Sequence, residues 1–397
     1  MVTSNNVKQF LFVLSGTEGP EEFARVKQLT ESDNVNASWI APENFRTLLP
    51  VGGQCISVPT FFSAGIRFWL YYPLVVNFFV ARHLLRQRSA KLLLFQSGLC
   101  LALFPTVLIF RNSSYIFLMR VPWGKRKLRQ GNWIIDSLVY LINCLGLLAA
   151  EKVIVTTYQM RSAILKEASF LGGRLAVLPL SLCRQGSLPE RAKSALENQI
   201  DKAARFYERR ERVSDDKLKL IQEFSLTEKS FVVTTFSEFL NLDVVSRLLH
   251  ALSDSGDERL CLIIVGKGPE KSNAQALALG LGLDQRVVFV VGDSVPDRLF
   301  HGADLYFATS QALVMSDNLM KGLSAGISLI AIDNIESREL LEFEELLVKN
   351  DAEMISQRLI ELQRNREELR LVRARCETIA KKYDFNWSLR ASELVST

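Results

Sequence analysis

A glycine-rich turn directly after a predicted strand is the segment of this sequence best suited to bind a ligand. The apolar run Leu262–Val265 leads into Gly266, Lys267 and Gly268. Glycines let the backbone turn tightly and come close to a ligand at the carboxyl end of a strand. Together with Lys271, the turn also carries two ammonium groups, which can donate hydrogen bonds to phosphate oxygens. The alternative is a pair of solvated loop lysines.

A second segment of interest follows a later predicted strand. Ser310, Leu313 and Lys321 come after the run Leu305–Ala308. Lys321 stands about one turn inside the next predicted helix, where its ammonium can reach phosphate oxygens. The start of that helix, Ser316-Asp317-Asn318, instead contains good N-cap residues, and its aspartate would repel an anion. Anion binding and plain helix capping therefore both stay open.

Neither a metal site nor a disulfide framework is predicted. His83, His250 and His301 are far apart and lie in no motif with ligand spacing, so we expect each at a surface or a helix end. The six cysteines are scattered, which indicates reduced thiols in a cytosolic compartment. Glu18 and Glu21, after the first predicted strand, are weak candidates for a general base.

The composition is that of a globular protein with a substantial core. The chain has 397 residues, of which 48% are hydrophobic and 23% charged. At roughly 100–200 residues per domain, this length suggests two domains. The apolar fraction excludes a disordered, collagen-like or small disulfide-linked chain.

The two halves of the chain differ in charge. The formal net charge is +5, but residues 1–181 contain 19 basic and 9 acidic side chains, whereas residues 182–397 contain 29 and 34. No acidic residue lies between Glu43 and Asp136, and this window holds 12 basic side chains. This excess of basic over acidic side chains indicates an anionic partner.

Short apolar runs alternate with helical patterns along most of the chain, which is typical of an α/β protein with parallel sheets. Strands are predicted at Phe10–Leu14, Leu92–Phe95, Tyr115–Val121, Val153–Thr157, Leu175–Leu178, Phe231–Thr235, Leu260–Val265, Val287–Val291, Leu305–Ala308 and Leu329–Ile332. Helices of the second half are predicted at Leu242–Leu252, Asn273–Leu279, Leu319–Ser324, Ala352–Arg364 and Arg366–Lys382. Between the halves, the charged segment from Pro189 to Arg212 predicts a solvated linking helix or a partner-binding arm.

Three apolar stretches of the first half raise the question of a membrane. They are Phe61–Ala81, Leu99–Phe110 and Ile134–Ala150. A spanning helix needs about 20 apolar residues, so only the first is long enough. Its flanks continue the strand–helix alternation, which favours a buried or interfacial helix over a transmembrane one.

Five further segments share their order and spacing with a known family. Gly302–Ser310, Gly322–Gly326 and Ala380–Trp387 follow the glycine-rich turn. Glu151–Thr157 and Gly173–Pro179 precede it. Together with the turn, they closely resemble family-4 retaining glycosyltransferases of the GT-B fold.

The resemblance implies an α/β fold of GT-B architecture, with two Rossmann-like domains facing across a cleft and a C-terminal helix that crosses back to the first domain. It divides the chain into an acceptor and membrane-facing domain at 1–182, a charged helical linker or insertion at 183–227, a nucleotide-sugar domain at 228–382 and a crossover helix at 383–397. The implied activity is sugar transfer with retention from a nucleotide donor such as a UDP- or GDP-sugar, without a metal. The implied donor-binding residues are Gly266, Lys267, Gly268, Ser310, Leu313 and Lys321.

Four positions depart from the family's pattern. The family's phosphate-binding arginine and lysine fall at Thr235 and Leu240, and its two glutamates fall at Leu313 and Lys321. Leucine cannot bind a sugar hydroxyl, and lysine has no acceptor for ribose hydroxyls. Two hypotheses follow. The protein is either a transferase with a rebuilt diphosphate site or a non-catalytic protein that binds and stabilises an active glycosyltransferase.

Basic and aromatic residues of the first half favour a membrane partner over nucleic acid. They are Arg67, Trp69, Arg82, Arg86, Arg88, Trp123, Lys125, Arg126 and Lys127. Tryptophan favours the membrane interface and basic residues are attracted to anionic lipid, whereas no nucleic-acid-binding motif is present. We expect peripheral attachment at the cytoplasmic face of the membrane, beside a lipid-linked acceptor. The alternative is a core helix with a solvated basic rim.

Overall fold

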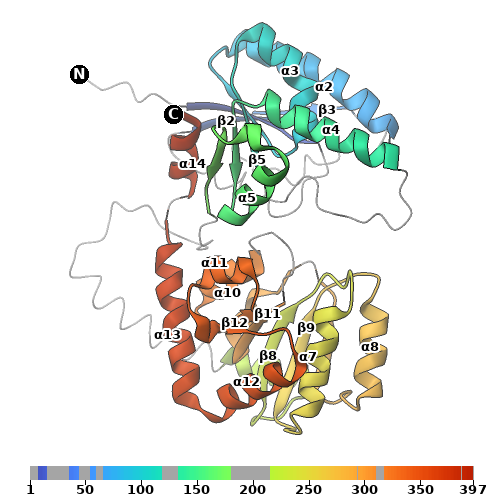
Figure 1. The fold of residues 1–397 in the computed structure, drawn as a ribbon, viewed down its shortest axis with the longest axis vertical. Coiled ribbons are helices and arrows are strands. Elements are labelled where there is room, and N and C mark those ends of the chain that lie inside the picture. The colour runs from blue at the N-terminus through green and yellow to red at the C-terminus, as the bar shows by residue number, and fades with distance from the viewer. Residues whose placement is uncertain are drawn as a thin grey trace, which may run out of the picture. The chain divides into compact units, whose positions relative to one another are not determined.

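The computed structural model divides the chain into two compact units (Figure 1). The first unit consists of Met1–Leu180 together with Asn386–Thr397, and the second of Ser181–Phe385. The residues that the structure describes are 8–15, 35–43, 54–59, 66–118, 133–179, 215–292, 294–309, 317–385 and 387–396.

The first unit is built on a seven-stranded sheet in which all paired strands are parallel. The strand order is β3-β2-β1-β4-β5-β6-β7, and it reverses between β1 and β4, as in a doubly wound sheet. The strands are β1 (Lys8–Val13), β2 (Val35–Pro42), β3 (Gln54–Val58), β4 (Lys91–Leu94), β5 (Ser114–Leu118), β6 (Lys152–Val155) and β7 (Leu175–Val177).

Burial on both faces of the sheet explains why most of these strands are continuous apolar runs. In β4, for example, residues 92–94 are fully buried. The sequence pattern does not predict β2 and β3, because polar residues such as Ser38 and Ser57 interrupt their apolar runs. Tertiary pairing overrides this local signal: β1 supplies the ladder for β2, and Trp39 stacks on Phe12 with 4.4 Å between ring centroids.

The three apolar stretches form helices α2 (Ile66–Arg86), α3 (Ser97–Phe110) and α4 (Trp133–Ala149), and α3 contacts both of the others (Figure 1). Their inward side chains belong to the core of the first unit. Within the described ranges, none of the helices combines the length and the apolar content needed to cross a membrane. A shorter helix, α5 (Tyr158–Glu167), follows β6 and is capped by the hydroxyl of Thr157.

His83 lies at a helix end, one of the two places expected from the sequence. It is in the last turn of α2 and is buried, with only 4% of its surface exposed. Burial lowers the pKa of its imidazole, because the charged form would lose hydration. Its Nε2 has no hydrogen-bond partner among the described residues. The uncharged ring therefore serves as a core side chain at this end of the helix.

The C-terminal helix α14 (Trp387–Ser396) packs with the first unit, although it follows the second unit in sequence. The ring of Trp387 lies 5.7 Å from that of Phe117 in β5. Lys152 donates to the backbone oxygen of Leu394 at 3.1 Å, and Lys91 donates to that of Val395. Lysines bound to the last carbonyls of a helix also complement its dipole. The predicted crossing of the C-terminal helix to the first domain is confirmed.

The second unit contains a six-stranded sheet, again parallel, with the order β10-β9-β8-β11-β12-β13. Its strands are β8 (Phe231–Phe236), β9 (Leu260–Val265), β10 (Val287–Val290), β11 (Leu305–Ala308), β12 (Ser328–Ile332) and β13 (Leu347–Val348). Its helices are α7 (Asp243–Asp254), α8 (Lys271–Gly280), α9 (Asp297–Gly302), α10 (Asp317–Ala325), α11 (Ile335–Leu341), α12 (Ala352–Arg364) and α13 (Arg366–Lys382). The sequence predicts five of the six strands; β13 has two residues, too few to form a pattern. The predicted α/β fold is confirmed.

A helical segment at 215–223 joins the second unit ahead of β8. Lys217 lies 2.6 Å from both carboxylate oxygens of Asp304, which also accepts from the backbone N–H of Val232 at 2.9 Å. Gly302 fits against this segment, since a Cβ there would lie 2.9 Å from the backbone oxygen of Asp216. One carboxylate thus ties the segment to the start of β8.

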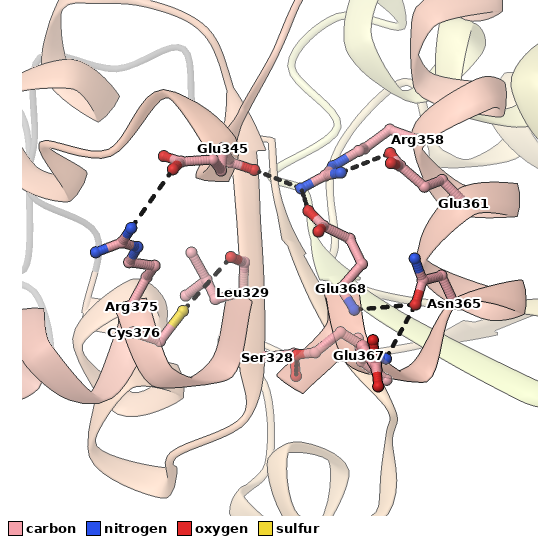
Figure 2. A network of polar contacts seen from close by, with 11 residues as sticks. Ser328, Leu329, Glu345, Arg358, Glu361, Asn365, Glu367, Glu368, Arg375 and Cys376 are labelled. Carbon is pink, nitrogen blue, oxygen red and sulfur yellow. Dashed lines mark hydrogen bonds and ion pairs between the residues drawn. The ribbon is translucent and has the colours of Figure 1, made fainter. Parts of the chain in front are cut away.

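Arg358 holds the corner between α12 and α13 (Figure 2). Its guanidinium donates to Glu361 at 2.5 Å, to Glu368 at 2.8 Å and to the backbone oxygen of Glu345 at 2.8 Å. The Arg358 side chain is only 16% exposed, so water can replace these bonds only in part. Asn365 caps α13 by accepting from two backbone N–H groups of its first turn.

The substitution Arg358→Ala is expected to lower the free energy of unfolding by about 2 kcal/mol, because it removes charged hydrogen bonds and leaves the partly buried Glu368 unpaired. Urea unfolding followed by circular dichroism measures this change. Arg370→Ala, at an exposed arginine of α13, is the matched control and should change the value by less than about 0.5 kcal/mol. Equal losses in the two variants would contradict a stabilising role of the corner.

Candidate functional site

The carboxyl ends of β8, β9 and β11 bring predicted donor residues to one edge of the second sheet. β8 pairs with β9 on one side and with β11 on the other, and the strand order reverses between β8 and β11. Doubly wound sheets bind ligands at this edge, where successive loops leave toward opposite faces. Gly266, Lys267 and Gly268 follow β9, and Lys321 lies in α10, the helix after β11.

The two glycines allow the loop after β9 to touch the loop after β8. A Cβ at Gly266 would lie 1.8 Å from the backbone oxygen of Ser237, and one at Gly268 would lie 2.0 Å from that of Glu238. Gly266 also has a φ of 154°, which side chains disfavour. The close approach that the sequence predicts is therefore present, but the group that approaches is the protein's own backbone.

Phe239 locks the loop after β8 in this position. Its ring is buried, and its backbone has a φ of 46°, which is unusual for a bulky residue. Its N–H donates to the Ser237 hydroxyl at 3.1 Å, and its carbonyl accepts from the backbone N–H of Glu270 at 3.0 Å. The ring lies 6.3 Å from that of Phe289 in β10. Phe239 thereby links three neighbouring strands, β8, β9 and β10.

Two threonines close the ladder between β8 and β11 at this edge. The fully buried Thr235 donates its hydroxyl to the carbonyl of Phe307 at 2.6 Å. In return, Thr309, just past β11, donates to the carbonyl of Phe236 at 2.6 Å. Because Thr235 is inside the sheet and its hydroxyl is bonded, this position does not present a phosphate-binding group at the surface. Leu240, in the loop after β8, is 67% exposed.

The loop after β9 carries two lysines next to the start of α8. Lys267 is exposed and Lys271 is half-buried in the first turn of the helix. This first turn has no acidic residue, and no side chain caps it. Its backbone N–H dipoles and the two ammonium groups attract anions, whereas the carboxylate of Glu270 opposes them. That carboxylate is engaged by Asn273 at 2.7 Å.

Lys321 lies in the middle of α10 and is half-buried. Asn318, at the start of α10, is buried and accepts from the backbone N–H of Val295 at 2.8 Å. The Asn318 side chain therefore binds the loop after β10, and Ser316, which directly precedes α10, lies outside the described residues. Ser310 and Leu313 lie outside the described residues.

The other sequence-predicted residues fall in three groups. Arg82, Arg86 and Arg88 are exposed at the end of α2. Arg67 and Trp69 lie in α2, but their side chains are not described. Outside the described residues are Glu18, Glu21, Trp123, Lys125, Arg126 and Lys127. Across the described ranges, no three histidine, cysteine or acidic side chains gather in a way that could hold a metal ion.

Sequence reasoning missed the residues that shape this edge. Phe239 and Thr309 have no motif of their own, and only the strand pairing gives them a role. Asp304 belongs to a recognised segment, but its contacts with Lys217 and the backbone of Val232 join residues far apart in sequence. The available signal was position: Thr309 directly follows a predicted strand.

The substitution Gly268→Ala is expected to destabilise the second unit by about 1–3 kcal/mol, because the added methyl group would overlap the backbone oxygen of Glu238 and force the two loops apart. Thermal unfolding measures the loss. Gly280→Ala, at the end of α8, is the control, since a Cβ there meets nothing within 4 Å. Wild-type stability in Gly268→Ala would mean that the loops are not in contact.

Comparison with known proteins places the second unit in a family. Residues 216–382 match the family model described as glycosyl transferases group 1. Among curated protein sequences, none matches the chain.

Solved structures match the whole chain at low identity. HepE from Anabaena, in complex with UDP-glucose, is 16% identical, with 98% of this chain and 99% of that chain covered and a TM-score of 0.70. A glycosyltransferase from Rickettsia africae is 11% identical, with 98% of both chains covered and a TM-score of 0.70. WaaG, a glycosyltransferase of lipopolysaccharide biosynthesis, is 14% identical, with 98% and 99% covered and a TM-score of 0.65. The chain thus has the GT-B fold, and its residues 216–382 match the model of the group 1 glycosyltransferases.

Proposed function

We propose that the protein is a glycosyltransferase that takes a sugar from a nucleotide-sugar donor, with retention of configuration, and holds the donor diphosphate through lysines of the second unit. The observation that carries this proposal is the carboxyl edge of the second sheet. There the unit that matches the group 1 model has a close-packed glycine turn, and lysines lie in the loop and helices that follow the strands on either side of β8. HepE, with the same fold, binds UDP-glucose.

The chemistry of sugar transfer explains why lysines matter at this edge. As the bond to the sugar breaks, negative charge grows on the departing nucleoside diphosphate, and fixed donors or cations must meet it. Lys267 and Lys271 follow β9, which lies on one side of β8, and Lys321 follows β11, which lies on the other side. In this proposal the flanking lysines take over from the arginine and lysine that the family has at Thr235 and Leu240.

A second function, that of a non-catalytic partner, is favoured by a different observation. The hydroxyl of Thr235 is buried and bonded, and Leu240 offers only apolar surface. A domain that lacks the side chains that bind phosphate can keep its fold and serve to bind and stabilise an active glycosyltransferase. Purification from the native host distinguishes the two: a catalytic glycosyltransferase recovered in equal amount favours this second function.

The proposed place of action is the cytoplasmic face of a membrane, where the acceptor is a lipid-linked glycan or glycolipid precursor. The acid-free window of the first unit supports this part of the proposal, since basic surfaces are attracted to anionic lipid headgroups.

Titration calorimetry with UDP, GDP and their sugars tests donor binding. At least one of them should bind, and Lys321→Ala should weaken that binding about tenfold, the loss of roughly one charged hydrogen bond. Lys229→Ala is the control, because Lys229 precedes β8 and so lies at the opposite edge of the same sheet. Absence of binding to every nucleotide sugar at millimolar concentration would rule out the transferase.

Charge reversal separates a rebuilt site from the family's usual one. Lys321→Glu restores the glutamate that the family has for the ribose hydroxyls. If Lys321 binds phosphate, this variant should bind the donor more weakly than Lys321→Ala, because a carboxylate repels the diphosphate. Tighter binding in Lys321→Glu would contradict a phosphate-binding role of Lys321.

A further inference from the structure

Helices α2, α3 and α4 expose large apolar side chains on their outward sides. These side chains, between 40% and 76% exposed, define the outer helical face: Leu74, Phe78, Leu85, Phe104, Leu108, Ile109, Leu141, Leu145 and Leu148. Spacings of three, four or seven residues place those of α2 and of α4 on one side of each helix, and in α3 Phe104 and Leu108 are four residues apart, with Ile109 next to Leu108. Because α3 contacts both α2 and α4, the three helices lie side by side in the first unit (Figure 1). Contiguous apolar surface of this kind marks a binding site.

Besides their shared apolar core, these helices are joined by hydrogen bonds between polar side chains and backbone groups. The amide of Asn77 donates to the backbone oxygen of Ala102 at 2.9 Å, and Thr106 donates to the Asn77 side chain. The Ser97 hydroxyl bonds to the Asn143 side chain in the same way. Helices that face lipid pack in this manner, with hydrogen-bonded polar groups inside and apolar groups outside.

A close backbone contact reinforces this packing. A Cβ at Gly146 of α4 would lie 1.9 Å from the backbone oxygen of Ser97 in α3. Small residues at such contacts let helix backbones approach one another closely.

The basic side chains near the outer helical face indicate what kind of partner binds there. Arg82, Arg86 and Arg88 are exposed at the end of α2, and Arg111 is exposed directly after α3. The sequence from α2 through α3 contains no acidic residue. An anionic bilayer complements this arrangement, because its headgroups meet the arginines and its acyl region meets the leucines. A second copy in a two-fold dimer would instead bring one basic rim against another.

We propose that the outer helical face inserts into the headgroup and acyl boundary of an anionic bilayer, with the four arginines at its rim. This goes further than attraction of basic residues to lipid, since the apolar side chains of α3 and α4 provide the insertion. The inference rests on the proposed function only in that a lipid-linked acceptor would be reached from this surface.

Flotation of the full chain with vesicles of phosphatidylglycerol and phosphatidylcholine tests the insertion. The double substitution Leu108→Ser with Ile109→Ser should reduce vesicle binding about tenfold, since two exposed apolar side chains are lost. The matched control is Leu279→Ser with Ile335→Ser, which removes two similarly exposed residues of the second unit and should float like wild type. Replacing Arg82, Arg86 and Arg88 with glutamine should weaken binding and reduce its dependence on salt.

Two readouts keep the alternatives apart. Nucleotide binding should be unchanged in the Leu108→Ser, Ile109→Ser variant. Loss of flotation in this variant, with intact nucleotide binding, supports insertion. If the wild-type protein floats but binds no nucleotide, only the proposed function is contradicted. Wild-type flotation of the double variant, or equal binding to pure phosphatidylcholine, would overturn the proposal. So would sedimentation of the wild type as a dimer that the double variant dissociates.

Discussion

The loops after β8 and β9 touch without room for a side chain between them. The arrangement of the carboxyl edge of the second sheet depends on that contact. Gly266 and Gly268 make it possible, and Phe239, with its positive φ, holds it in place. The carboxyl ends of β8 and β11 are tied by Thr235 and Thr309. The edge is thus preorganised by backbone packing, and Lys267 and Lys271 lie in the loop and helix that follow β9.

The sequence predicted the sheets far better than the details of the site. Long apolar runs such as Leu260–Val265 are strands in both prediction and structure, because parallel strands buried on both faces leave a clear signal. β2 and β13 were not predicted, because polar residues interrupt the apolar run of β2 and because β13 has only two residues. The glycine turn was found by its motif. What the glycines contact was not predictable, because the backbone oxygen of Ser237 carries no sequence signal.

Each of the two units has one unusual local feature. In the second unit, Thr235 is buried at the end of β8 while Leu240, in the loop that follows, is exposed. In the first unit, helices α2 to α4 bond through Asn77 and Ser97 inside and expose leucines outside. The first feature bears on donor binding and the second on attachment to lipid. They lie in separate units and can be tested independently.

The central claim is that a nucleoside diphosphate binds at the carboxyl edge of β8, β9 and β11. Hydrogen exchange followed by mass spectrometry, with and without saturating UDP or GDP, tests it most directly, because bound phosphate protects the amides it contacts. The account predicts slower exchange at residues 266–273 and in α10, with no change at residues 227–230 on the opposite edge. Protection confined to other segments, or no protection by either nucleotide, would contradict it.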